Sequence, residues 1–315
     1  MSASGTVATD GEAARRRGPL ARLWGELRRE ESRTAWLFLS PALLHMVVFL
    51  GFPVVYGFWL SLNEWNMVSP RITFVGLDNY LRLLDDAKFM SSLANTAYFT
   101  VALVAAVLVF SLAVALLLDM PLRSIGLYRS IYYSPAVTSV VAIGVVWYWM
   151  FDPQYGIINQ GLALLGIAGP RWLADSDLAM PALILTAAWR NIGYFATIFL
   201  AGLQGIDNSY YEAASIDGAD RLGKFRHITM PLLAPATFFV LVMTIINSFQ
   251  VFALVYVMTA GGPVGATRVV VFHLYQEAFV YFRLGSASAI GYVLFSVIFV
   301  LTLVQFRFLG KHSEV

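Results

Sequence analysis

Residues 212–220 read Glu212-Ala213-Ala214-Ser215-Ile216-Asp217-Gly218-Ala219-Asp220, and the segment continues to Ile228-Thr229-Met230-Pro231 as a polar island between two apolar stretches. The dipole of a helix favours a negative charge near its start, so Glu212 to Ile216 predicts a short helix. Gly218 should break that helix, and a second one is expected from about Ala219 to Ile228, ended by Pro231. The pattern therefore predicts two short helices that lie along a membrane surface, within a loop of residues 204–233.

Six apolar segments are long enough to cross a bilayer, because a helix needs about 20 residues at about 1.5 Å each to span about 30 Å of hydrocarbon. They run approximately from Ala35 to Leu60, Asn95 to Leu118, Ser130 to Met150, Met180 to Leu203, Ala234 to Val257 and Ala287 to Phe308. Glycine and proline within them predict kinks, at Gly51, Pro53, Pro135 and Gly193. The expected fold is an all-α polytopic membrane protein, with residues 35–309 as one six-span domain.

The composition supports a membrane protein. Hydrophobic residues make up 59% of the chain and charged residues 13%, whereas about a quarter of the residues in soluble domains are charged. The chain has no cysteine, which excludes disulfides and thiolate metal sites. Its net charge of +2 is too small to indicate binding to nucleic acid. The four scattered histidines lack metal-ligand spacing, and His273 is expected to pair with Glu277 on a helix surface.

The distribution of Lys and Arg predicts the orientation. Of the 21 Lys and Arg residues, 14 fall in the two tails and in the connections on the same side, 6 fall on the opposite side, and Arg190 lies within a span. By the positive-inside rule, both termini and the Glu212 loop are cytoplasmic. No apolar core follows Met1, so residues 1–34 are expected to be an uncleaved, flexible cytoplasmic tail. Residues 310–315 are expected to form a second cytoplasmic tail.

Several polar side chains fall in or near the hydrocarbon. Placing a polar group there costs free energy, so each is expected to have a structural or functional role. Asn247 and Gln250 are three residues apart on one helix face, and Tyr256 lies close to that face. Such groups either line a path for a hydroxylated solute or hold the bundle together by interhelical hydrogen bonds. For Arg190 we expect a role as a gate or ion-pair residue. The candidate residues of a solute path are Arg190, Asn191, Asn247, Gln250, Tyr256 and Ser288.

One pattern in the loop imitates a nucleotide site. Residues Gly218 to Lys224 satisfy G-x-x-x-x-G-K, but the next residue is Phe225. A phosphate-binding loop needs Ser or Thr there for magnesium, and a strand before it, so we reject nucleotide binding by this chain. No clustered acid, base or metal set indicates an enzyme. An ion-coupled secondary transporter is the alternative of another class, although the spans hold almost no acidic residue for ion coupling.

The loop resembles the cytoplasmic loop of binding-protein-dependent ABC importer permeases. The pattern of that family is E-A-A, three residues, Gly, nine residues, Ile, one residue and Leu-Pro, and every spacing matches, with Met230 in place of Leu. In that family the loop inserts into a cleft on the ATPase subunit. The resemblance implies that the ATPase-coupling residues are Glu212, Ala213, Ala214, Asp217, Gly218, Ala219, Ile228 and Pro231.

The resemblance extends from about Leu37 to Gly310 and is greatest to the carbohydrate-uptake branch, of the glycerol-3-phosphate, lactose and maltose type. It is carried by Phe74 to Tyr80, Phe151 to Gly156, Ile216 to Ala219 and Thr259 to Pro263. It implies a six-span type I importer bundle in a bacterial inner membrane. The implied partners are a second homologous permease, two ATP-binding cassette subunits, an extracytoplasmic solute-binding protein and membrane lipid. This chain would bind no cofactor, because the partner ATPase uses the ATP and magnesium.

The substrate class follows from charge. Arg190 is the only cation away from the ends of the predicted spans, and a phosphate would need more positive charge. We therefore expect a neutral mono- or oligosaccharide, with a glycerol-3-phosphate or polyol importer of the same family as the alternative.

Overall fold

The computed structural model describes residues 30–67, 71–120 and 123–309, with side chains from residue 34 to residue 307. The two expected tails lie almost entirely outside these ranges. The described chain is nearly all helical, and its one sheet pairs two short strands, Asn63–Glu64 (β1) and Thr73–Phe74 (β2), in antiparallel fashion. Two compact units can be distinguished, residues 1–59 and residues 60–315.

The described part of the first unit is a single long helical run. It comprises α3 (Glu30–Met46), the π-type turn η1 (Val47–Gly51) and most of α4 (Phe52–Ser61). The stretch from Thr34 to Ser61 is a candidate span of 28 residues, and none of its most apolar window is buried. The kink predicted at Gly51 and Pro53 coincides with η1. Proline has no amide hydrogen, so a wider turn directly before it accommodates the missing donor.

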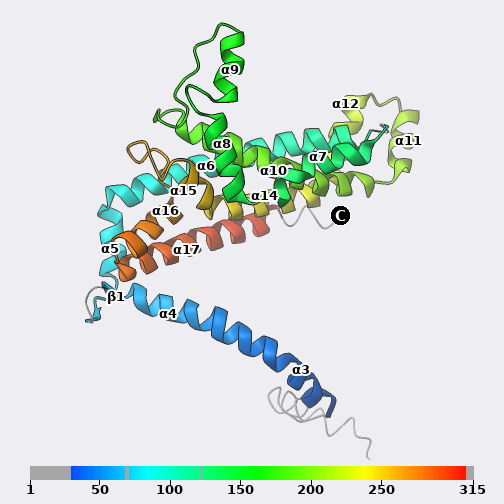
Figure 1. Cartoon of the computed structure of the whole chain (residues 1–315). Helices are drawn as coiled ribbons and strands as arrows, with labels where there is room; N and C mark the ends of the chain where they lie inside the picture. The colour runs from blue at the N-terminus through cyan, green and yellow to red at the C-terminus, as the bar shows by residue number, and fades with distance from the viewer. Residues whose placement is uncertain (1–29, 68–70, 121–122, 310–315) are drawn as a thin grey trace, which may run out of the picture. The chain divides into compact units, whose positions relative to one another are not determined.

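The second unit holds three further unbroken candidate spans (Figure 1). These are α6 (Ala87–Leu118), α10 (Ala179–Gln204) and α17 (Leu284–Leu309). Two bent pairs also pass the length and hydropathy test. The first is α7 (Ile125–Val137) with α8 (Val140–Met150), bent by 99°, and the second joins residues 221–232 to α14 (Ala234–Phe249), bent by 63°. The described residues thus give four spans, or up to six if each bent pair is one span, which agrees with the predicted all-α six-span fold.

Three spans differ from their predicted limits. The helix α6 begins at Ala87 rather than Asn95, and the Asp86 carboxylate caps it by accepting from the amide of Lys88 at 2.8 Å. The hydroxyls of Ser92 and Thr96 donate to carbonyls of the same helix, so these polar residues fit within it. The third span begins at Ile125 and breaks at residues 138–139, just after Pro135. The fifth, predicted to continue to Val257, stops at Phe249 and resumes as α15 (Ala253–Met258).

The kink predicted at Gly193 is absent, because α10 runs unbroken through this position. A Cβ atom at Gly193 would overlap the backbone carbonyl oxygen of Tyr132 in α7. The glycine therefore serves the close approach of two helices instead of a bend.

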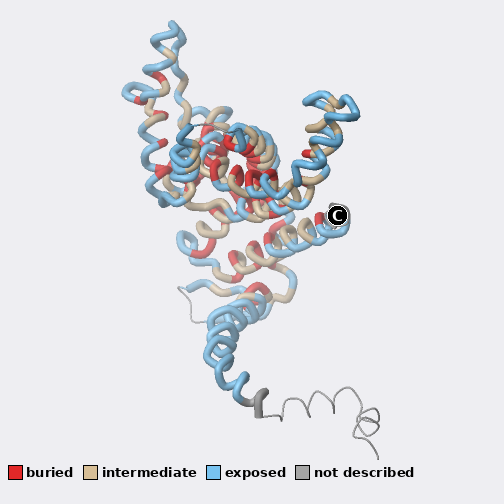
Figure 2. The backbone as a smooth tube through the Cα atoms, turned by 90° about the vertical axis from the view of Figure 1, so that its right-hand side faces the viewer, coloured by how far each residue is buried: buried red, intermediate tan, exposed pale blue. Residues whose placement is uncertain are grey.

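The core of the second unit lies where α6, α10 and α14 meet, and Figure 2 shows the buried positions gathered within this bundle. Apolar side chains from all three helices are almost completely inaccessible to solvent. They include Val107, Leu183, Phe195, Phe199 and Val240. This packing places the middle of α10 and α14 next to α6.

The connections on the other side from residues 204–233 carry short helices. They are α5 (Asp78–Asp85), α9 (Ile157–Leu164), α16 (Val270–Tyr275) and the π-type turn η3 (Gln276–Val280). The expected surface pairing of His273 with Glu277 is wrong, because both side chains are buried. His273 instead places Nε2 3.5 Å from Oδ2 of Asp86, and Glu277 pairs with Arg283 at 3.8 Å. Because α16 and η3 pack against α6 and α17, the helix face that carries His273 and Glu277 points into the protein.

Candidate functional site

The loop between α10 and α14 folds into two helical arms. The first arm is α11 (Asn208–Ile216), and the second comprises α12 (Arg221–Lys224), the π-type turn η2 (Phe225–Thr229) and α13 (Met230–Leu232). The prediction of two short helices is correct, but Pro231 does not end the second one. The amide of Met230 bonds to the carbonyl of Phe225 across η2, so Pro231 sits at the start of α13, where no amide donor is needed. The chain then continues into α14.

Each arm starts at an aspartate cap. The Asp207 carboxylate accepts a hydrogen bond from the amide of Ser209 at 2.8 Å, and Asp220 accepts one from the amide of Gly223 at 2.7 Å. These bonds satisfy amides that would otherwise lack a partner at the helix start. The hydrogen bond from Ser209 also lowers the pKa of Asp207, so the cap is ionised and intact near neutral pH.

Gly218 ends the first arm in a left-handed conformation, with φ of +79°. The amide of Ala219 donates to the carbonyl of Ala214 at 2.9 Å, and the amide of Gly218 donates to the carbonyl of Ser215 at 3.2 Å. This pair of bonds defines the Schellman motif, which requires positive φ at the glycine position. No atom lies within 4 Å of the place where a Cβ at Gly218 would stand, so only the backbone conformation selects glycine here.

Side-chain contacts tie the two arms together. The ammonium of Lys224 donates to the hydroxyl of Ser215 at 2.6 Å, and the hydroxyls of Tyr211 and Thr229 lie 2.9 Å apart. Capped ends, a fixed turn and two cross-links make the loop a preformed element.

The surface of this element is open. Glu212, Ala213, Asp217, Gly218 and Pro231 are exposed, and Ala214, Ala219 and Ile228 are half-buried. Among the described residues Glu212 has no hydrogen-bond or ion-pair partner. Ile216 is 88% exposed and Leu222 70% exposed. A loop that exposes a free carboxylate and two apolar side chains is suited to contact with another protein.

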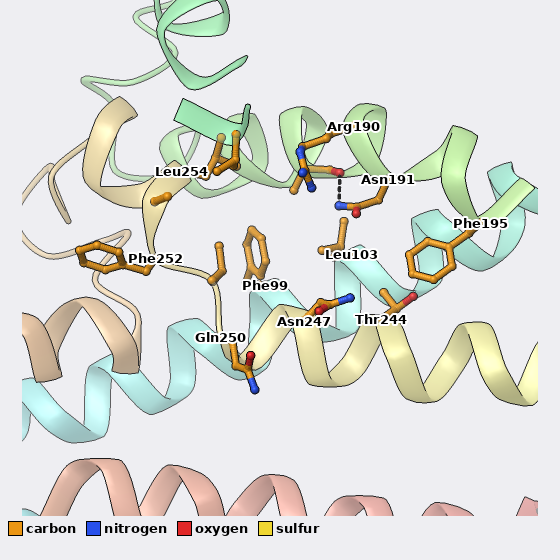
Figure 3. A pocket seen from close by; sticks show the side chains of 14 residues that line it. Phe99, Leu103, Arg190, Asn191, Phe195, Thr244, Asn247, Gln250, Phe252 and Leu254 are labelled. Atoms are coloured by element: carbon orange, nitrogen blue, oxygen red, sulfur yellow. Dashed lines mark hydrogen bonds between the residues drawn. The ribbon is translucent and has the colours of Figure 1, made fainter. Parts of the chain in front are cut away.

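A cavity of about 340 Å³ lies in the bundle, and Figure 3 shows its lining. It brings together four of the six residues predicted for a solute path: Arg190 and Asn191 from α10, Asn247 from α14, and Gln250 from the break after α14. The Asn191 amide donates to the carbonyl of Ala187 at 2.7 Å. The buried Nε of Arg190 has no hydrogen-bond partner among the described residues.

The other two predicted residues lie elsewhere. Tyr256 lines a separate cavity of about 510 Å³, and Ser288 is half-buried on α17 and does not belong to the lining of the first cavity. The prediction also missed Thr244, which precedes Asn247 by three residues and thus shares its face. The lining aromatics Phe99 and Phe195 could not be told from core residues, because apolar side chains are common in every span.

The matching family model covers residues 125–312 and describes a binding-protein-dependent transport system inner membrane component. This chain belongs to that family. It is a permease subunit of a binding-protein-dependent ABC importer. The matched residues include both arms of the loop and three of the segments that line the cavity, whereas the α6 residues of the lining precede the matched part.

Relatives of this permease match it over nearly their whole length. The sn-glycerol-3-phosphate transport system permease protein UgpA of Agrobacterium fabrum is 35% identical, over 88% of this chain and 94% of the relative. The trehalose/maltose transport system permease protein MalF of Thermococcus litoralis is 33% identical, over 90% of this chain and 96% of the relative.

Solved structures show the same permease fold. A chain of a bacterial ABC transporter involved in the import of the acidic polysaccharide alginate superposes with a TM-score of 0.79, over 92% of this chain and 99% of that chain. The identity is 21%, so this likeness concerns the fold. A structure of a bacterial alginate transporter in complex with an alginate pentasaccharide-bound periplasmic protein gives a TM-score of 0.80 at 20% identity.

Proposed function

We propose that this permease forms one half of the pore of a sugar importer and is driven by an ATPase bound to its 204–233 loop. The observation that carries the proposal is a shared pair of helices. The helix α10 supplies Arg190 and Asn191 to the cavity and leads directly into the loop, and α14 leaves the loop and supplies Asn247. At about 1.5 Å per residue, both α10 and α14 place the cavity about 20 Å from the loop.

Force would therefore pass from loop to cavity along continuous helices. When ATP closes the ATPase dimer, the preformed loop moves with the cleft that holds it, and α10 and α14 move with the loop. Glu212 and the other exposed loop residues would make the contact. ATP and magnesium stay with the ATPase, and this chain needs no cofactor of its own.

The cavity suits a neutral hydroxylated solute. Asn191, Asn247 and Gln250 offer amide donors and acceptors, and the break at residues 250–252 exposes irregular backbone at the cavity wall. Irregular backbone at membrane depth is tolerated where it lines a cavity. Relatives are named for trehalose/maltose and for sn-glycerol-3-phosphate. A single guanidinium, that of Arg190, supplies little positive charge to bind a phosphate. The cavity therefore favours a neutral sugar over glycerol-3-phosphate or another polyol derivative.

The proposed assembly adds a second homologous permease, two ATP-binding cassette subunits and an extracytoplasmic solute-binding protein. The chain would cross a bacterial inner membrane several times with both termini in the cytoplasm. This orientation follows from the excess of Lys and Arg on the loop side.

Affinity purification tests the assembly. The chain is tagged at its C-terminus, extracted gently from its native membrane and analysed by mass spectrometry. Recovery of an ATPase and a second permease is expected, and addition of neutral sugars should stimulate ATP hydrolysis in the presence of the solute-binding protein. Recovery of the chain alone, under conditions that preserve a known importer, would contradict the proposal and favour a secondary transporter.

A further inference from the structure

The connection between α8 and α10 contains an uncharged segment that projects from the bundle. Residues 153–170, here called the α9 segment, contain no Asp, Glu, Lys or Arg. Figure 1 shows α9 extending away from the bundle of α6, α10 and α14 and far from α11 and α12. A solvent-exposed loop usually carries charge, so the composition of this segment requires an explanation.

The base of the α9 segment is rigid. The buried side chain of Asn159 donates to the carbonyls of Pro153 at 3.2 Å and Pro170 at 3.0 Å, and accepts a hydrogen bond from the indole of Trp172 at 2.7 Å. A Cβ atom at Gly169 would overlap the Asn159 amide, so glycine permits the chain to pass this close. The two ends of the segment are thus fastened to one side chain, and its tip is held in a fixed position.

That tip exposes large apolar side chains. Leu164 is 89% exposed and Leu165 74% exposed, and Ile157 and Ile167 are also exposed. Contiguous exposed apolar side chains of this kind mark contact with a protein or with lipid.

We propose that the α9 segment is an interfacial membrane anchor, with its apolar tip in the boundary between headgroups and acyl chains of the leaflet on the far side from the coupling loop. Lipid is favoured by two neighbours. Trp149 at the end of α8 and Tyr155 near the start of the segment are exposed, as aromatic rings are at the level of the headgroups. Val145 and Val146 are exposed on α8, so the apolar surface continues from the segment onto a helix of a candidate span.

A soluble binding protein is a poorer fit for this surface. Transient contacts between proteins have a polar, charged rim that guides the encounter. Residues 153–170 offer no charge for such a rim. The anchor rests on the membrane-spanning fold alone and is independent of the identity of the transported solute.

Site-directed fluorescence tests the anchor, and the chain suits it because it contains no cysteine. The variant Leu164→Cys in the full-length chain, purified with the subunits that accompany it, is labelled with an environment-sensitive nitrobenzoxadiazole dye. It is reconstituted into phosphatidylcholine and phosphatidylglycerol vesicles that contain lipids with a nitroxide on the acyl chain. The matched control is Asp177→Cys, an exposed polar position of the same connection. Leu165→Cys serves as a second reporter if the first variant does not fold.

For the dye at residue 164 we expect blue-shifted emission and at least twofold quenching by nitroxide lipids, and for residue 177 neither effect. Blue-shifted emission without quenching by lipid would place a protein on the tip and overturn the anchor. Emission typical of water at residue 164 would overturn it as well. Neither result would affect the proposed transport function, which is tested by co-purification and by sugar-stimulated ATP hydrolysis.

Discussion

The backbone carbonyl of Tyr132 occupies the space that a Cβ atom of Gly193 would fill. This contact joins α7 to α10 within one helical turn of Arg190 and Asn191, and so fixes one wall of the cavity. A backbone atom cannot move aside as a flexible side chain does, so the distance between the two helices depends on the absence of a side chain at residue 193.

The variant Gly193→Ala should therefore lower the free energy of unfolding by about 1–3 kcal/mol, the usual effect of overpacking. Thermal unfolding of the purified protein in detergent measures the change. The control is Gly126→Ala in α7, where no atom lies within 4 Å of the added Cβ. Equal melting temperatures for the two variants would show that the helices separate without cost.

Replacement of Gly218 by alanine should loosen the loop, because an alanine in the left-handed conformation costs about 1–2 kcal/mol. We expect faster hydrogen exchange at the amides of Gly218 and Ala219, whose bonds close the first arm. Gly218→Asn should have a smaller effect, since asparagine adopts positive φ more readily. Identical exchange in both variants would argue against the conformational explanation.

Charge reversal at Glu212 should uncouple transport from ATP hydrolysis. The carboxylate is exposed and has no partner among the described residues. Loss of about 1.4 kcal/mol of binding free energy between the loop and the ATPase corresponds to a tenfold loss of affinity. Uptake by Glu212→Lys should therefore fall at least about tenfold. The amount of protein in the membrane should stay the same. Asp177→Lys, on an exposed connection remote from the loop, is the control, and normal uptake by Glu212→Lys would refute the coupling role.

Truncation of Asn247 should weaken the interaction with the solute. Removal of one uncharged hydrogen bond costs about 0.5–1.5 kcal/mol, which predicts an increase of about two- to tenfold in the KM of uptake. Ser296→Ala on the exposed face of α17 should leave KM unchanged. An unchanged KM for Asn247→Ala, with reduced thermal stability, would assign Asn247 to interhelical bonding instead.

Stability should depend on pH through His273, which lies outside the candidate spans. Burial lowers the pKa of His273, against the opposing effect of Glu277 and Asp86 and with a smaller lowering by Arg268. The unfolded chain then binds more protons than the folded one between the lowered pKa and the ordinary value of about 6.5. The free energy of unfolding should rise with pH across that window and be flat above it.

Melting temperatures at several pH values, for the parent chain and for His273→Asn, provide the measurement. In the His273→Asn variant, the melting temperature should depend less steeply on pH below about pH 6.5. His227→Asn, at an exposed position of the loop, should retain it. The same slope in all three proteins would exclude His273 as its origin.

Local interactions explain why the loop was predictable. The turn at Gly218 and the start of the second arm at Asp220 depend on residues three to five positions apart, and such contacts can be recognised from spacing. The continuation of the helix through Pro231 was missed, because the π-type turn before it has no signature in residue type. The likeness of the loop to a known family supplied the functional reading, and the matching family model supports it.

The break in the fifth span could not be predicted, whereas the break in the third span lies just after Pro135, where a kink was expected. The run from Ala234 to Val257 is predominantly apolar on both sides of residue 249, so average hydropathy does not mark the stop at Phe249. The break after Gln250 changes the direction of the chain, which places Tyr256 in another cavity than Asn247. Partners of buried polar groups, such as Asp86 beside His273, come from segments almost two hundred residues apart and need the tertiary structure.

The loop and the cavity differ in how they are encoded. All residues of the two arms lie in one uninterrupted stretch, whereas the cavity draws on α6, α8, α10 and the region from α14 to α15. The proposed ATPase-binding surface can thus be exchanged between permeases as one continuous stretch, without alteration of the proposed solute path. Chimeric permeases with a transplanted loop would retain the solute of one parent and accept the ATPase of the other, so the two specificities can diverge independently in evolution.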